Sequence, residues 1–341
     1  MPENRDLQPR ASPADADEVL APVVLDRQWE LVTRWTAWLD EQVAQHQLAA
    51  ETRTGYRETI RYWLAFLERD ARTDQPTPAT IQQYVTTLIA AELKPATINF
   101  YLNVVKSFYR WCESGDHYPA IGRSIRTIRE YHDGPLPALS HNQIVALVKL
   151  IPEDTLGHIR DRALLSLMYA TAFRCISVVR ADIDDVDLDR CTIAHQPKGH
   201  LAKDTAAIIP RSVADILTRY LDRRRAEIGI PSEPLQPLFI ALDRRCAGRR
   251  MTAKSIRYQV LTYMELAGHA KRREDGTLVH PRLFSAHSIR RSASVTTADA
   301  AGLEVAQGLL GHASIETTRK AYARVSLERR LRENAKRLDS L

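Results

Sequence analysis

Apolar residues recur mostly at helical spacing along this chain, which predicts a mainly helical protein with a little sheet. In the first part, helices are expected near 29–45, near 50–68, and in the segments "TPATIQQYVTTLIAAE" and "KPATINFYLNVVKSFYRWCES". Thr77 is placed to cap the third helix, and Pro78 fits its first turn. The pattern predicts a small unit of four amphipathic helices.

A helix-breaking segment, "EYHDGPLPALS", separates this unit from the rest of the chain. Its glycine and prolines stop helices, and Ser140 can cap the next one. In the following segment, "ADIDDVDLDRCTIAHQPKGHLAKDTAAIIP", short Val/Ile/Thr-rich pieces between turns predict a small antiparallel sheet. Helices are expected around this sheet near 141–150, 157–173, 212–228, 252–267, 286–300, 303–311 and 314–325.

The 341 residues suit two domains, since domains usually have about 100–200 residues. The charged C-terminal segment has leucines that allow it either to dock on a neighbouring protomer or to fray in solvent. We therefore expect a flexible tail at 1–22, a helical domain at 23–132, a linker at 133–139, a second mostly helical domain at 140–325 and a C-terminal segment at 326–341.

Composition is that of a soluble globular protein, with 44% hydrophobic and 26% charged residues. No apolar run approaches the roughly 18 residues that a membrane span needs, and the polar N-terminus is unlike a secretion signal, so we expect a cytoplasmic protein with no membrane partner. The net charge of +6 indicates a polyanionic partner only weakly. The widely spaced cysteines argue against a zinc site and a disulfide framework: Cys112, Cys175, Cys191 and Cys246.

Two helices of the first part have polar stripes: Arg53, Arg57 and Arg61 on one, and Asn99, Asn103, Lys106 and Arg110 on the other. Such stripes match the phosphates of a DNA backbone, and an asparagine can reach a base edge. Each stripe alone is equally typical of a solvated helix face. Because two stripes occur in one small unit, DNA binding and a solvated helix face are about equally favoured.

The second part contains an ordered set of chemically capable residues: Arg174, Lys198, His287, Arg290, His312 and Tyr322. A tyrosine hydroxyl has a pKa near 10 and is a weak nucleophile unless cations or a base assist it. If it attacks a phosphodiester, arginine and histidine can stabilise the charge on the phosphate, and a lysine can protonate the leaving oxygen. Each residue alone has an ordinary structural explanation. The complete ordered set indicates phosphoryl transfer.

This set resembles the signature of the tyrosine recombinases, the phage-integrase family that includes Cre and the Xer proteins. The family order is Arg, Lys, His-x-x-Arg, His or Trp, then Tyr, and the residues above match it one by one, with His312 in "LLGHASIETT". The resemblance implies that Tyr322 is the nucleophile and Lys198 the general acid. The first part, about 25–130, resembles the family's helical, SAM-like core-binding domain, so the likeness covers nearly the whole chain.

The chain departs from the family pattern at two places. Ser177 stands three residues after Arg174, where the family commonly has an acidic residue. The spacing from His312 to Tyr322 is one residue longer than usual and that from Arg290 to His312 one shorter, so the total is kept. A further lysine, Lys203 in "LAKD", is an alternative to Lys198.

The resemblance implies a site-specific DNA recombinase or integrase. Its reaction would pass through a 3′-phosphotyrosyl intermediate without a cofactor, metal ion or ATP. The partners implied are double-stranded DNA recombination sites, further copies of the chain in a tetramer on paired sites, and accessory DNA-bending proteins. Two alternatives remain open: relaxation of DNA in the manner of a type IB topoisomerase, and a non-catalytic DNA-binding regulator with the same fold.

Overall fold

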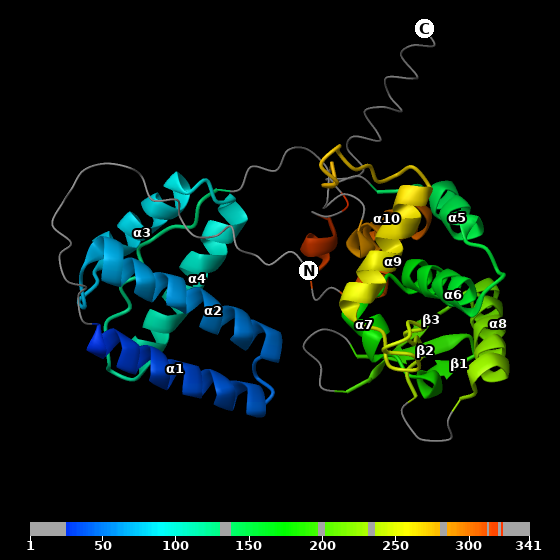
Figure 1. Cartoon of the computed structure of the whole chain (residues 1–341), viewed down its shortest axis with the longest axis horizontal. Coiled ribbons are helices and arrows are strands. Elements are labelled where there is room, and N and C mark those ends of the chain that lie inside the picture. Colours follow the sequence, from blue (N-terminus) through cyan, green and yellow to red (C-terminus); the bar gives the residue numbers. More distant parts are fainter. Residues whose placement is uncertain are drawn as a thin grey trace, which may run out of the picture. The chain divides into compact units, whose positions relative to one another are not determined.

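The chain divides into two compact units, Met1–His132 and Asp133–Leu341 (Figure 1). The computed structural model describes residues 25–129, 138–196, 202–230, 236–279, 285–311, 314–319 and 322. These residues are mostly helical and include one small antiparallel sheet, as the sequence predicted.

The first unit contains the four expected helices: α1 (Asp26–Ala44), α2 (Ala50–Phe66), α3 (Pro78–Ala90) and α4 (Pro95–Ser114). A π-helical turn, Leu67–Ala71, continues α2. At the start of α3, the Thr77 side chain accepts a hydrogen bond from the Thr80 amide, and Pro78 occupies the first helical position. The predicted cap is therefore confirmed.

The core of the first unit is aromatic and includes one polar chain. Trp35 and Trp63 are fully buried. The Trp63 indole donates to the Tyr109 hydroxyl at 3.1 Å, and this hydroxyl donates to the side chain of buried Gln28 at 2.9 Å. Trp63, Tyr109 and Gln28 thus satisfy one another inside the core, which avoids the cost of leaving these groups unpaired.

The second unit begins with α5, whose predicted cap, Ser140, accepts from the Gln143 amide. Its remaining elements surround one core. In chain order the elements are α5 (His141–Leu150), α6 (Leu156–Thr171), α7 (Cys175–Arg180), a 3₁₀ turn (Ile183–Asp185), β1 (Val186–Asp187), β2 (Thr192–His195), β3 (Thr205–Ile208), α8 (Arg211–Ile228), α9 (Ala253–Leu266), α10 (Ala286–Ala301) and α11 (Leu303–Leu310).

The three strands form an antiparallel sheet in the order β1-β2-β3. Strands β2 and β3 pair from Thr192↔Ile208 to His195↔Thr205, so the connection between them begins at Gln196. Ile193 is fully buried and anchors the sheet on the core. The connection contains Lys198, which lies outside the described residues.

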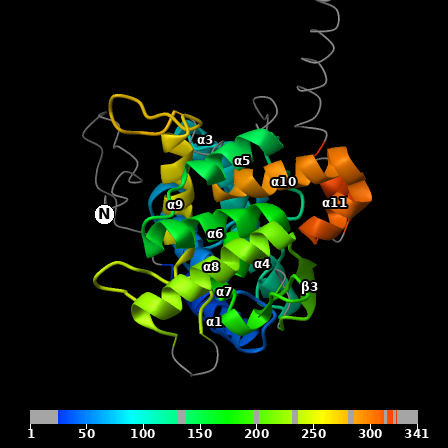
Figure 2. The same ribbon diagram turned by 90° about the vertical axis from the view of Figure 1, so that its right-hand side faces the viewer.

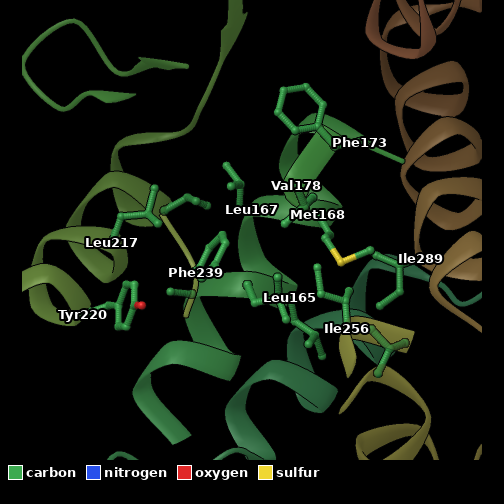
Figure 3. Packing of buried hydrophobic residues seen from close by; sticks show 14 of the residues in the cluster. Leu165, Leu167, Met168, Phe173, Val178, Leu217, Tyr220, Phe239, Ile256 and Ile289 are labelled. Carbon is green, nitrogen blue, oxygen red and sulfur yellow. The ribbon is translucent and has the colours of Figure 1, made fainter. Parts of the chain in front are cut away.

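Helix α6 forms the centre of the second unit. It packs against α5, α8 and α10 (Figure 2). Leu165, Leu167 and Met168 of α6 lie in the buried cluster with Phe239 and Ile289 (Figure 3). The two residues that follow α6, Ala172 and Phe173, are buried as well, so the chain is anchored in the core directly before Arg174.

Candidate active site

Arg174 occupies the N-cap position of α7, directly after the end of α6. The sequence predicted one helix through residue 173, but α6 ends at Thr171 because Ala172 adopts a left-handed conformation, with φ 52°. This conformation is uncommon for a residue with a side chain and is typical of functional turns. It makes Arg174 the first residue of a new element, and the arginine is half-buried there.

Arg290 projects from α10 into the interior and is only 5% exposed. Its guanidinium donates to the carbonyl oxygen of Ala172 and, at 2.6 Å, to that of Leu310. These carbonyls lie at the C-terminal ends of α6 and α11, where helix dipoles favour a cation. Among the described residues, no carboxylate forms an ion pair with Arg290, so the positive charge there is not cancelled.

The charges of Arg174, His287 and Arg290 act on one another. Burial and the neighbouring Arg174 lower the pKa of Arg290 to about 10. Partial desolvation, together with Arg291, Arg290 and Arg174, lowers the pKa of His287. The structure therefore brings together three of the predicted catalytic residues in a cationic cluster that favours a bound anion.

Tyr322 lies apart from this cluster along α10. Its hydroxyl donates to a carboxylate oxygen of Asp299 at 2.8 Å. Asp299 is nine residues after Arg290 on the same helix, which corresponds to roughly 13 Å along the helix axis. The structure therefore does not bring Tyr322 to the cationic cluster. Asp299 was not predicted from the sequence, because a single exposed aspartate outside any motif does not stand out as a functional residue.

Lys203, the alternative general acid, is occupied by two carboxylates. Its amine donates to Asp182 at 2.6 Å and also to Asp185. Burial alone would lower the pKa of Lys203, but the hydrogen bonds and charges of Asp182 and Asp185 raise it. A lysine held in this way is a poor proton donor. Lys198 and His312 lie outside the described residues, so their contacts stay predictions.

Ser177, which replaces the family's usual acidic residue, is buried. Its hydroxyl donates to the Gln196 carbonyl oxygen at 3.4 Å. Arg180 donates to the Gln196 side chain at 3.1 Å. Helix α7 therefore contacts the first residue of the β2–β3 connection through neutral hydrogen-bond acceptors.

The three arginines of the α2 stripe differ in their partners. Arg53 pairs with Asp40 of α1 at 3.3 Å. Arg57 is half-buried and Arg61 is exposed, and neither pairs with a carboxylate within the described ranges. Arg57 and Arg61 therefore keep their charge for an external anion such as a DNA phosphate.

The polar stripe of α4 packs mainly against the segment that leaves the first unit. The Asn99 side chain donates to the Ile128 carbonyl at 2.9 Å and accepts from the Ile128 amide at 2.8 Å. Lys106 donates to the Ile125 carbonyl. Burial and the nearby Arg110 lower the pKa of Lys106. Asn99 and Lys106 thus have structural partners that the helix pattern did not reveal.

Asn103 and Arg110 are the exposed members of the α4 stripe. A cavity of about 200 Å³ beside Arg110 is also lined by Lys106, Ala120, Gly122 and Arg123. Arg123, which pairs with Glu113, belongs to an irregular segment and so had no helical periodicity to mark it. Three cations around one cavity add to the basic character of this surface.

In the part of the chain that the structure describes, no helix is long and apolar enough to span a membrane. Within the same residues, no group of three histidine, cysteine, aspartate or glutamate side chains is arranged to hold a metal ion.

Comparison with known proteins places both units in one family. Residues 137–329 match the phage integrase family, and residues 36–114 match its N-terminal SAM-like domain. The chain is 26% identical over 316 residues to the tyrosine recombinase XerC of Syntrophus aciditrophicus, which covers 88% of this chain and 94% of XerC.

Solved structures have the same fold at lower identity. The site-specific recombinase XerH, in a post-cleavage complex with its difH substrate, is 17% identical with a TM-score of 0.64, covering 92% of this chain and 88% of XerH. A lambda integrase tetramer bound to a Holliday junction is 14% identical with a TM-score of 0.61, covering 86% of this chain and 76% of the integrase. With the family match extending over more than half of its residues, the chain belongs to the phage integrase family of tyrosine recombinases.

Proposed function

We propose that this chain is a site-specific DNA recombinase that cuts and rejoins strands through a 3′-phosphotyrosyl intermediate. The observation that carries the proposal is the state of Arg290. It is buried and its hydrogen bonds go to carbonyl oxygens at two helix ends. Burial and Arg174 lower its pKa, and its own charge contributes to the lowered pKa of His287. A buried cation of this kind is stabilised by an anion, and a DNA phosphodiester is the anion that this family acts on.

In the first step, the Tyr322 hydroxyl gives up its proton to solvent, its oxygen attacks phosphorus and a new P–O bond forms. The bond from phosphorus to the 5′-oxygen breaks, and that oxygen takes a proton from Lys198. Arg174, Arg290, His287 and His312 hold the non-bridging oxygens, where negative charge accumulates. In the second step, the 5′-hydroxyl of a partner strand gives its proton to Lys198 and attacks phosphorus, and the displaced Tyr322 oxygen takes a proton from solvent. One phosphodiester replaces another, so the step consumes no ATP.

This mechanism requires Tyr322 to leave Asp299 and reach the phosphate held by Arg290. Asp299 and Arg290 lie at different positions on α10, so the Tyr322 hydroxyl cannot contact Asp299 and attack a phosphate at Arg290 at the same time. We propose that DNA binding shifts this competition towards the phosphate. If the shift never occurred, the chain would act as a non-catalytic DNA-binding regulator, which is the alternative that the Asp299 contact favours.

The proposed partners are double-stranded DNA recombination sites and three further copies of the chain on paired sites. The lambda integrase tetramer on a Holliday junction supports this assembly by similarity of fold. Half-buried Arg57 and exposed Arg61 and Arg110 would contact the DNA backbone from the first domain. Accessory DNA-bending proteins are a further proposed partner.

The test measures covalent adduct formation on DNA. A duplex recovered by binding selection from random-sequence DNA, nicked beside each candidate phosphate in turn, is incubated with the full chain and analysed on a denaturing gel. The wild-type chain is expected to form an adduct that Tyr322→Phe abolishes. Tyr258→Phe, at a tyrosine that is 64% exposed on α9, is the matched control and should leave the adduct unchanged. Specific binding without any adduct would support the regulator instead.

A further inference from the structure

The connection between β2 and β3 is attached at both ends to the segment that Arg174 begins. On the outgoing side, Ser177 and Arg180 of α7 hold Gln196, the residue after β2. On the return side, Lys203, two residues before β3, is bound by Asp182 and Asp185. These carboxylates follow α7 directly.

The return-side attachment is the stronger of the two. The Asp182 side chain is 7% exposed and that of Asp185 is 13% exposed, so both ion pairs to Lys203 are largely shielded from solvent. Asp185 also accepts from the backbone amide of Asp182 at 2.7 Å, which fixes the turn between them. Shielded, hydrogen-bonded ion pairs of this kind are costly to break.

Arg250 joins the same group from the segment before α9. It pairs with Asp182 and donates to the carbonyl oxygens of Val179 at 2.7 Å and Ala181 at 3.0 Å. Two carboxylates therefore face two cations, and the charges cancel. The group has no net charge for a phosphate to neutralise, which indicates a mechanical role.

We infer that Lys203 is a positioning residue: its ion pairs to Asp182 and Asp185 attach the β3 end of the β2–β3 connection to the turn after α7, the helix that Arg174 begins. The inference rests on the proposed function, because Lys198, five residues earlier in the same connection, is its general acid. A displacement of about 1 Å at a reacting group can lower a rate about 100-fold.

The test separates loss of the proton donor from general damage. Adduct formation is measured on the nicked duplex and on the same duplex with sulfur in place of the bridging 5′-oxygen. A thiolate leaves without a proton because a thiol has a pKa near 8.5, far below that of an alcohol. Lys203→Met is expected to form adduct about 10- to 100-fold more slowly than wild type on the oxygen substrate and within about threefold on the sulfur substrate.

Two variants distinguish positioning from direct proton donation by Lys203. Lys203→Arg keeps both ion pairs but cannot act as an acid, because the arginine pKa lies above 12. Positioning predicts that Lys203→Arg retains most of the rate on oxygen, whereas proton donation by Lys203 predicts a loss as large as that of Lys203→Met. Lys198→Met, the reference for an absent acid, should be slow on oxygen and rescued by sulfur.

The control is Arg190→Gln, which removes an exposed ion pair to Asp187 in the same sheet and should leave both rates unchanged. Equal slowing of Lys203→Met on both substrates, or no slowing on either, would overturn the inference. If Lys203→Met does not fold, Asp185→Asn weakens the same attachment while Asp182 and Arg250 stay paired, and the same rescue is expected. Absence of any adduct from the wild-type chain on both substrates would refute the proposed function itself.

Discussion

The second unit contains two groups of cations whose charges are balanced in opposite ways. Arg290 is buried against the carbonyl oxygens of Ala172 and Leu310, next to further cations. Lys203 and Arg250 lie against the carboxylates of Asp182 and Asp185. Carbonyl oxygens have only partial charges, so the first group keeps a positive potential, whereas the second is neutral.

The difference shows how the partner of an arginine or lysine separates a binding role from a structural one. A cation that binds carbonyl oxygens is oriented but remains available to an incoming phosphate. A cation that binds shielded carboxylates is already neutralised, and removing it leaves a buried anion. The same chain uses both arrangements within one unit, so matched substitutions can compare them.

The largest effect is expected from Arg290→Lys compared with Arg250→Lys. Lysine cannot reproduce the planar fork that binds a phosphate and two carbonyl oxygens. Arg290→Lys should lower the rate of adduct formation by about 10³-fold or more, and the free energy of unfolding by about 1–3 kcal/mol because a buried carbonyl oxygen loses its donor. Arg250→Lys should lower the free energy of unfolding by about 1–3 kcal/mol and the rate by about tenfold at most. Adduct assays and urea unfolding measure both quantities, and a reversed order would break the comparison.

The next largest effect is expected in the first unit, where Asn99→Ala removes a side chain with internal partners and Arg61→Ala removes an exposed cation. Asn99 satisfies both backbone groups of Ile128, so its loss should lower the free energy of unfolding by about 1–3 kcal/mol and change DNA affinity little. Exposed Arg61 should show the opposite: unchanged stability, weaker DNA binding, and a salt dependence reduced by about one phosphate contact. Urea unfolding and DNA binding at several salt concentrations test both variants. A DNA-binding loss in folded Asn99→Ala would restore the base-contact hypothesis.

A smaller effect is expected when the contact between Tyr322, the proposed nucleophile, and Asp299 is removed. Asp299→Ala deletes the acceptor of the Tyr322 hydroxyl, and the free energy of that exposed hydrogen bond no longer opposes the movement to the phosphate. Adduct formation should accelerate about 3- to 10-fold in single-turnover assays. Asp299→Asn, which keeps a neutral acceptor, should lie between wild type and Asp299→Ala. A slower reaction would instead show that Asp299 places Tyr322 productively.

The smallest expected effect is the pH dependence of the free energy of unfolding that arises from His287 in the cationic cluster. Partial desolvation and the charges of Arg291, Arg290 and Arg174 lower the pKa of His287 from its ordinary value near 6.5. Below about pH 6.5 the unfolded chain therefore binds the proton first, and stability falls as pH decreases, until the lowered folded-state pKa is reached. Above pH 6.5 both states are neutral and no loss occurs.

Unfolding of the wild-type chain and of His287→Gln between pH 7.5 and 5.5 tests this expectation. The loss attributable to His287 should be about 1 kcal/mol or less and absent from the variant. Added inorganic sulfate should reduce the wild-type slope, because an anion beside Arg290 favours protonated His287. An identical slope in His287→Gln would show that the histidine is not part of the cluster.

Features that depend on neighbours three or four residues away were predicted from the sequence. Thr77 and Ser140 cap their helices through bonds to the amide three residues on, and the His-x-x-Arg spacing puts His287 and Arg290 on one helix face. The order of the catalytic set also identified the family, because that order is a property of the chain itself. Contacts within one turn of a helix join residues that are close in the sequence, so the sequence pattern predicts them directly.

Partners far away in the sequence were decided only by the tertiary structure. Asn99 binds Ile128 instead of remaining on an open stripe, Lys203 binds Asp182, and Tyr322 binds Asp299. A helix pattern shows which residues leave the core, but it does not show which segment packs over them. The sequence therefore determined which groups are available for chemistry. Packing decided which of them are neutralised internally and which keep a charge for an external anion, because only neighbours in space satisfy a hydrogen bond or cancel a charge.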